Sequence, residues 1–276
     1  MIFDSHAHYD DARFDEDREE LLYSLYEQGI KKVMNVGSDL ASIGKVLEYV
    51  KKYQSRNGNH NAVLSEYEKN DSKYFPDFYG AVGIHPSETE NLNGKDLEYL
   101  KSAASQDGIV AIGEIGLDYY YDEPEADIQK KWFHLQLDLA EERNLPVIIH
   151  SRDACQDTLE ILKERKNVTG VIHCFSYTKE TAAEYVKMGY YIGIGGVVTF
   201  KNAKKLKEAV ESIPMERIVL ETDCPYLAPE PHRGTRNSSL MIPYIIEEIA
   251  RIKGIEPAQV EEAAWKNTHR LFHIAQ

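Results

Sequence analysis

Residues 146–152 read Pro-Val-Ile-Ile-His-Ser-Arg, and this short stretch carries the pattern that predicts the fold. Its apolar run, Pro146–Ile149, is continuous rather than alternating, as expected of a parallel strand that is buried on both faces. Polar residues, a histidine first, follow directly. Similar runs rich in Val and Ile occur at Ile2–Phe3, Lys32–Val36, Tyr79–Ile84, Ile109–Ile112, Gly170–Ile172, Tyr190–Ile194 and Ile218–Leu220.

Apolar residues at helical spacing separate these runs, for example Ile128, Trp132, Leu135 and Leu139. Alternation of strands and helices predicts a parallel sheet, because parallel strands need crossover connections. Eight such units indicate an α/β fold of the TIM (β/α)8 barrel type, with the active site at the C-terminal ends of the strands. An open doubly wound sheet is the alternative, but it favours a glycine-rich loop after the first strand, where this chain reads DSHAHYD.

The length of 276 residues suits one barrel, so a single domain over residues 1–276 is expected. A polar excursion at about residues 53–73 interrupts the pattern between the second and third runs, and it reads as a surface insertion rather than a domain boundary.

Acidic residues outnumber basic ones by 46 to 32, which gives a net charge of −14. This balance disfavours a basic surface that coats nucleic acid, although it permits a local phosphate-binding pocket. No secretory signal and no apolar stretch of the roughly 18 residues that span a membrane is visible, so no membrane association is expected. Cys155, Cys174 and Cys224 are widely spaced, as expected of reduced thiols in a cytoplasmic protein. No obligate protein partner is indicated.

Histidines and carboxylates recur where the predicted strands end. His6 and His8 close the first strand, and residues two apart on a strand point to the same side. Ends of parallel strands in a barrel meet at one face, and a buried cluster of this kind is costly without a cation to offset it. The sequence therefore predicts a metal site there. The residues concerned are His6, His8, His85, Glu114, His150, His173 and Asp223.

Seven motifs resemble the TatD-like metal-dependent hydrolases of the amidohydrolase superfamily. They are DSHAH, GIHP, GEIGLDYY, PVIIHSRDA, IHCFS, ETDCPYLAP and HRG, in the family's order, and an N-T-x-R-x-F ending follows at Asn267–Phe272. The resemblance implies a TIM barrel that binds one or two divalent metals, and several family members act as deoxyribonucleases. One departure follows HRG, where the chain reads Arg-Asn-Ser-Ser over residues 236–239 without the family's usual Pro.

The resemblance also implies a set of ligands. His6, His8 and Asp223 match the ligands of the first metal, and Glu114 matches the carboxylate that bridges both metals. His150 and His173 match the ligands of the second. Imidazole and carboxylate together suit Zn, Mn, Fe, Co or Ni, and Mg less well because it prefers oxygen, so the metal's identity stays open.

The expected function is a metal-dependent hydrolase, foremost a deoxyribonuclease that trims single-stranded DNA from the 3′ end. A hydroxide between two metals would attack, with Asp223 as the base. The alternative is an amidase, esterase or deacylase of a small or tRNA-linked ester; a non-catalytic metal-binding scaffold is the weakest reading. The substrate would then be a DNA end or a small ester. Candidate substrate-binding residues are His85, Arg152, Tyr119, His232 and Arg233, where arginine suits phosphate and an aromatic ring suits a base.

Overall fold

A computed structural model describes residues 1–54 and 74–275. Apart from Tyr53 and Gln54, the predicted polar excursion at 53–73 lies outside the described residues. Among the described helices, none combines the length and the apolar character that crossing a membrane requires.

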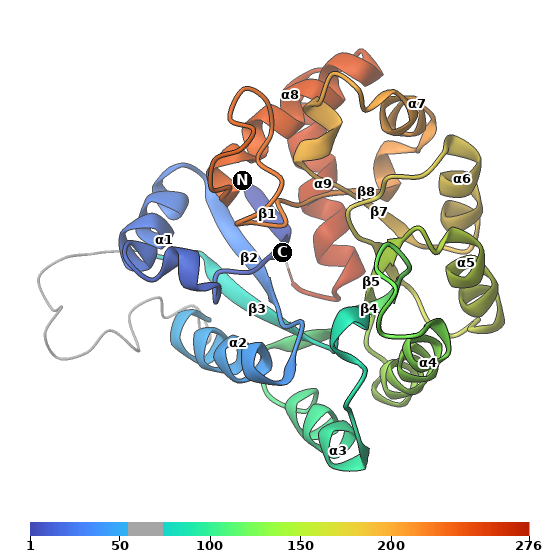
Figure 1. Cartoon of the computed structure of the whole chain (residues 1–276). Helices are drawn as coiled ribbons and strands as arrows, with labels where there is room; N and C mark the ends of the chain where they lie inside the picture. The colour runs from blue at the N-terminus through green and yellow to red at the C-terminus, as the bar shows by residue number, and fades with distance from the viewer. Residues whose placement is uncertain (55–73, 276) are drawn as a thin grey trace, which may run out of the picture.

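Eight parallel strands form one sheet in the order β1 to β8, and helices surround it (Figure 1). The predicted TIM-barrel architecture is confirmed. The strands are β1 Ile2–Ala7, β2 Ile30–Val36, β3 Asp77–Val82, β4 Ile109–Asp118, β5 Val147–Arg152, β6 Gly170–Ile172, β7 Tyr191–Ile194 and β8 Ile218–Leu220. The helices are α1 Arg18–Glu27, α2 Leu40–Tyr53, α3 Gly94–Ala103, α4 Ala126–Arg143, α5 Cys155–Glu164, α6 Lys179–Lys187, α7 Lys204–Ser212, α8 Ile242–Lys253 and α9 Pro257–Leu271.

Two strands extend further than their apolar runs predict. β4 continues past Ile112 to Asp118, and β5 continues to Arg152, because Gly116 pairs with His150 and Asp118 with Arg152. Glu114 and His150 therefore lie inside their strands rather than at the ends, which corrects the expected positions. Gly116 permits this close pairing, because its φ is +144° and a Cβ there would lie 1.9 Å from the His150 carbonyl oxygen.

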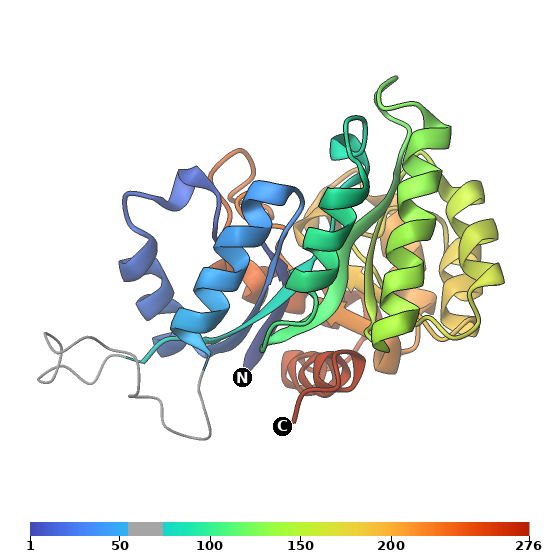
Figure 2. The same cartoon turned by 90° about the horizontal axis from the view of Figure 1, so that it is seen from below.

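The apolar core has two parts. The larger cluster lies between the strands and the surrounding helices. The smaller cluster takes residues from all eight strands, among them Phe3, Ile148 and Val219, and adds Leu271 and Phe272 from the C-terminal end of the chain. Helix α9 lies across the amino-terminal ends of the strands, as Figure 2 shows. This end of the barrel is closed by apolar packing, which leaves the opposite end for the polar residues.

Candidate metal centre

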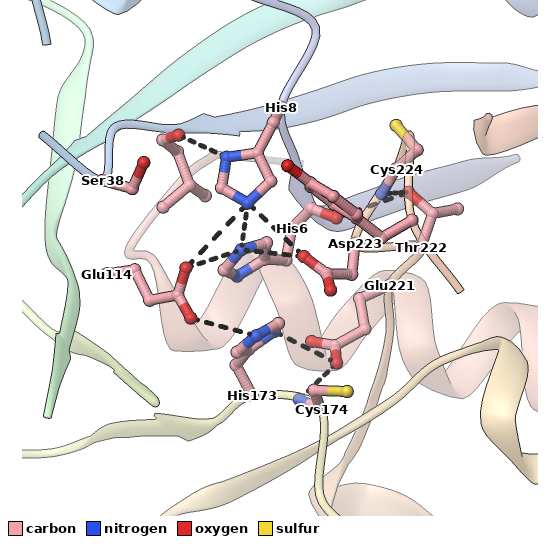
Figure 3. Close-up of polar contacts among 12 residues, drawn as sticks. His6, His8, Ser38, Glu114, His173, Cys174, Glu221, Thr222, Asp223 and Cys224 are labelled. Atoms are coloured by element: carbon pink, nitrogen blue, oxygen red, sulfur yellow. Dashed lines mark hydrogen bonds and ion pairs between the residues drawn. The ribbon is translucent and has the colours of Figure 1, made fainter. Parts of the chain in front are cut away.

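Backbone hydrogen bonds beyond the end of β8 close the barrel and bring the first three ligand candidates together. Asp223 N–H donates to the His6 carbonyl at 2.9 Å, and His8 N–H donates to the Cys224 carbonyl at 2.9 Å. The His6 and His8 Nε2 atoms lie 3.1 Å apart. Asp223 Oδ1 lies 3.4 Å from His8 Nε2 and 3.7 Å from His6 Nε2 (Figure 3). The three donor atoms thus lie within 3.7 Å of one another, as ligands of a single metal ion would.

Glu114 connects this group to a second one. Its Oε2 lies 3.5 Å from His6 Nε2, while its Oε1 lies 2.8 Å from His150 Nδ1 and 3.2 Å from His173 Nε2. The residue is only 4% exposed. A single buried carboxylate therefore presents one oxygen to each group. The structure brings all six residues predicted as metal ligands into one cluster.

The electrostatics of the cluster favour added positive charge. Burial opposes ionisation of Glu114, but the charge on His173 and hydrogen bonds from His150 and His173 hold the pKa of Glu114 well below its usual range. Burial likewise lowers the pKa of His8, yet Asp223 and Glu114 raise it to about 9. Six nitrogen and oxygen donors in a site that attracts positive charge fit divalent metal ions.

Two of the ligand histidines have hydrogen-bond partners on the side away from the cluster. His8 Nδ1 lies 2.8 Å from the Val36 carbonyl oxygen, and His150 Nε2 lies 3.1 Å from Asp118 Oδ2. Such partners orient the ring of a metal ligand. Asp118 is not among the residues predicted from the sequence. The available signal was its position in GEIGLD, four residues after Glu114.

His85 lies beside the cluster. Its Nδ1 accepts a hydrogen bond from Ser87 N–H at 3.1 Å, which places the ring proton on Nε2, 3.8 Å from Glu114 Oε1. Burial lowers the pKa of His85 to about 4, so the ring is neutral at pH 7. His85 therefore offers an N–H donor beside the cluster.

A cavity of about 830 Å³ opens above the cluster. His85, Arg152, Tyr121 and Tyr226 are among its lining residues. The Arg152 guanidinium lies 3.7 Å from the centroid of the Tyr120 ring and 5.7 Å from that of Tyr121. Arg152 and His85 thus lie where a substrate could meet the ligand cluster.

Three other predicted substrate-binding residues lie elsewhere among the described residues. Tyr119 donates its hydroxyl hydrogen to Asp157 at 2.8 Å, because its side chain points toward α5 rather than into the cavity. His232 Nε2 lies 2.9 Å from the Tyr244 hydroxyl. The Arg233 guanidinium covers the Phe200 ring at 4.4 Å. None of these three residues is among those that line the cavity, and their role in substrate binding stays a prediction.

Comparison with known proteins identifies the family of this chain. The family model for TatD-related DNases matches residues 3–273. The chain belongs to the TatD family of metal-dependent hydrolases. It is 39% identical to the uncharacterized metal-dependent hydrolase YabD of Bacillus subtilis, over 99% of this chain and 100% of that protein. It is 43% identical to YcfH of Escherichia coli, likewise an uncharacterized metal-dependent hydrolase, over 70% of this chain and 73% of that protein. The crystal structure of YjjV, a TatD homolog from Escherichia coli, superposes with a TM-score of 0.87 at 27% identity, covering 99% of this chain and 98% of that one.

In this TatD-family chain the segment after HRG is held by buried hydrogen bonds, although the family's usual proline is absent. Asn237 Nδ2 donates to the carbonyls of Thr222 and Tyr226 at 2.9 and 2.7 Å. Ser239 donates its hydroxyl hydrogen to Asp4 Oδ2 at 2.6 Å, and Thr222 donates to the same oxygen at 2.6 Å. Buried hydrogen bonds thus connect this segment to the residue that precedes Asp223.

Proposed function

We propose that this chain is a divalent-metal-dependent phosphodiesterase that removes nucleotides from the 3′ end of single-stranded DNA in the cytoplasm. The observation that carries the proposal is the position of Arg152 on the wall of the cavity above the ligand cluster. A guanidinium group binds phosphate through a bidentate fork, and the neighbouring tyrosine rings suit stacking on a base. The description of the matching family as TatD-related DNases supports the same substrate class.

Two ions are proposed, one held by His6, His8 and Asp223 and one by His150 and His173, with Glu114 shared between them. Nitrogen donors favour Zn, Mn, Co or Ni over Mg. When bound, such ions lower the pKa of water and polarise the bond under attack.

Asp223 is the proposed general base. Burial would raise its pKa, but the hydrogen bond with His8 and the charges on His173 and His6 lower it, so the carboxylate is ionised at pH 7. Its side chain remains 19% exposed and lines the cavity. Asp223 can therefore accept the proton of the attacking water and return it to the leaving 3′ oxygen.

His85 and Arg152 are proposed to bind the phosphate that is attacked. The neutral His85 ring donates its Nε2 hydrogen to one phosphate oxygen, and Arg152 neutralises the charge on the others. Tyr121 and Tyr226 also line the cavity and are 59% and 48% exposed, so both rings present surface on which a terminal base can stack; the Arg13 guanidinium lies 4.1 Å from the centroid of the Tyr226 ring. A short contact of this kind is compatible with the net charge of −14, which disfavours long duplex binding.

A second candidate is a hydrolase of carbonyl esters, such as aminoacyl esters of tRNA. The observation that favours it is the charge of the cavity lining. Beyond the ligand cluster and Asp118, the described lining residues carry four carboxylates, Asp10, Asp11, Asp39 and Glu88, against two cations, Lys45 and Arg152. Such a lining attracts the ammonium group of an aminoacyl ester.

One panel tests both candidates. Metal-free protein is reconstituted with Zn, Mn, Co, Ni or Mg and offered 3′-labelled single-stranded DNA, duplex DNA, RNA and an aminoacyl ester. The phosphodiesterase predicts release of labelled mononucleotides from single-stranded DNA, abolished by chelation and by Glu114→Ala. Release of amino acid without nucleotide supports the second candidate. Failure of every metal-loaded form to release nucleotide overturns the first.

A further inference from the structure

Glu221 lies beneath the ligand cluster and takes no part in the proposed reaction. It follows β8 directly and is 1% exposed. Figure 3 shows its carboxylate beside His173, on the side opposite Glu114. A buried carboxylate in this place needs partners, because an unpaired one is strongly destabilising.

The contacts of Glu221 are incomplete on the described protein atoms. Its Oε1 accepts a hydrogen bond from Cys174 N–H at 2.5 Å and lies 3.4 Å from His173 Nδ1, too poorly aligned in the present rotamers to count as a hydrogen bond. Its other oxygen, Oε2, lacks a hydrogen-bond partner among the described residues, and so do His173 Nδ1 and His6 Nδ1; all three atoms are buried. A ring nitrogen of His6, a ring nitrogen of His173 and an oxygen of Glu221 lie within 4.8 Å of one another.

The two imidazoles are aligned with each other. Their rings are stacked, with centroids 3.7 Å apart and planes 17° apart. Both Nε2 atoms face Glu114, at 3.5 Å for His6 and 3.2 Å for His173. Both Nδ1 atoms therefore point away from the cluster, and for His173 that direction leads to Glu221.

β7 leaves room for this carboxylate. A Cβ added at Gly193 would lie 2.3 Å from Glu221 Oε2, so any side chain there would displace it. Glu221 is thus held between Gly193, the Cys174 amide and the two rings.

We infer that Glu221 is a positioning residue that serves both metal sites at once, by accepting the Nδ1 hydrogens of His6 and His173. A ring that carries its proton on Nδ1 presents a free Nε2 lone pair, which is the form that binds a metal ion. Because His6 belongs to the first proposed site and His173 to the second, one carboxylate sets the orientation of a ligand in each. The inference rests on the metal centre of the proposed function, but not on its substrate.

Asp118 supplies a matched comparison. It faces one ligand histidine, His150, at 3.1 Å, and His150 belongs to the second proposed site. Loss of Asp118 should therefore weaken one site, whereas loss of Glu221 should weaken two.

The test measures binding of Zn²⁺ to metal-free protein by competition with a chromophoric chelator, for the wild type, Glu221→Gln and Asp118→Asn. In Glu221→Gln we expect both dissociation constants to rise about 10- to 100-fold, and in Asp118→Asn only one. A purely structural role would lower the urea midpoint of metal-free Glu221→Gln and leave both dissociation constants of the folded protein at their wild-type values.

Three results would overturn the inference: unchanged affinity in Glu221→Gln, weakening of a single site, or three ions bound by the wild type against two by the variant, which would make Glu221 a ligand. If Glu221→Gln does not fold, Gly193→Ala displaces the carboxylate without removing it, and it should also weaken both sites. Since the readout is metal binding, a failure of the nuclease proposal leaves this test intact.

Discussion

The two ends of this barrel differ in the side chains that fill the interior, which are apolar at one end and polar at the other. At the amino-terminal end, apolar side chains from every strand fill the interior and α9 covers them; we call this cluster the floor, and it comprises Phe3, Met34, Val36, Ala81, Ala111, Ile148, Val171, Tyr191, Val219, Leu271 and Phe272. At the carboxyl-terminal end, the six predicted ligands lie together with His85, Asp118 and Glu221.

The two ends also differ in whether their buried groups have interaction partners. Floor residues gain stability from packing, and each fills its space. At the other end, His6, His173 and Glu221 each keep a buried polar atom without a partner among the described residues. Stability is thus concentrated at the floor, and the metal end gives up part of it for the chemistry we propose. Substitutions at the two ends should therefore have opposite signatures.

The largest effect is expected at the metal end. Glu114→Ala removes the carboxylate that faces both groups of ligands, so turnover of whichever substrate the panel identifies should fall about 10⁴-fold. Its affinity for Zn²⁺ should fall as well, because the carboxylate that both groups of ligands share is gone. Activity assays and Zn²⁺ titration of the same preparation check both parts. Retained turnover would contradict the shared position of Glu114.

Phe3→Ala should show the reverse. Phe3 is 2% exposed and packs against Tyr79, Trp265, His269 and Phe272. Removing its ring should lower the free energy of unfolding by about 3–5 kcal/mol, measured by urea denaturation. The affinity of the folded fraction for Zn²⁺ should stay at the wild-type value. A variant that loses metal affinity while keeping its stability would erase the distinction between the two ends.

The strands that form the floor can be predicted from the sequence more completely than the metal end. Strands buried on both faces appear as continuous apolar runs, so the barrel was predictable. The polar ends of β4 and β5 were not, because their pairing continues into residues that no longer look like a buried strand. Glu114 and His150 could be predicted as metal ligands from the sequence, although they lie inside β4 and β5 rather than at the strand ends.

Residues whose partner comes from another strand were the hardest to predict. Asp118 acts on His150 of β5, and Glu221 faces His173 after β6, so neither contact has a local signature. The three consecutive tyrosines at 119–121 gave no basis for choosing among them. Tertiary packing decides, since Asp157 binds the Tyr119 hydroxyl while Arg152 stacks on Tyr120.

Arg152→Ala separates two parts of the metal end, because it changes the cavity wall and leaves the ligand cluster unchanged. A charge-assisted hydrogen bond to a phosphate contributes about 1.5–3 kcal/mol, so KM for single-stranded DNA should rise about tenfold or more. The turnover number should fall as well, because Arg152 is proposed to neutralise charge on the phosphate that is attacked. Arg233→Ala is the control, since Arg233 covers Phe200 away from the cavity, and its KM should equal that of the wild type. Equal effects of the two variants would remove Arg152 from substrate binding.

The smallest effect is expected for charges outside both ends, in the outer ring of helices. Glu248 of α8 lies 2.8 Å from Arg251 Nε and 2.7 Å from Lys207 Nζ of α7. Hydrogen bonds from Arg251 and then Lys207 lower the pKa of Glu248 to about 2, against an ordinary value of 4.5. A lowered pKa means that the pairing stabilises the fold above pH 4.5 and that this stabilisation is lost as the pH falls toward 2. Arg251 is 65% exposed, so solvent screens the pair and Glu248→Gln should cost at most about 1 kcal/mol at pH 7. Urea unfolding of the wild type and of Glu248→Gln between pH 7 and pH 3 measures this difference in the free energy of unfolding. The difference should shrink on acidification, and a difference that grew would contradict the pairing.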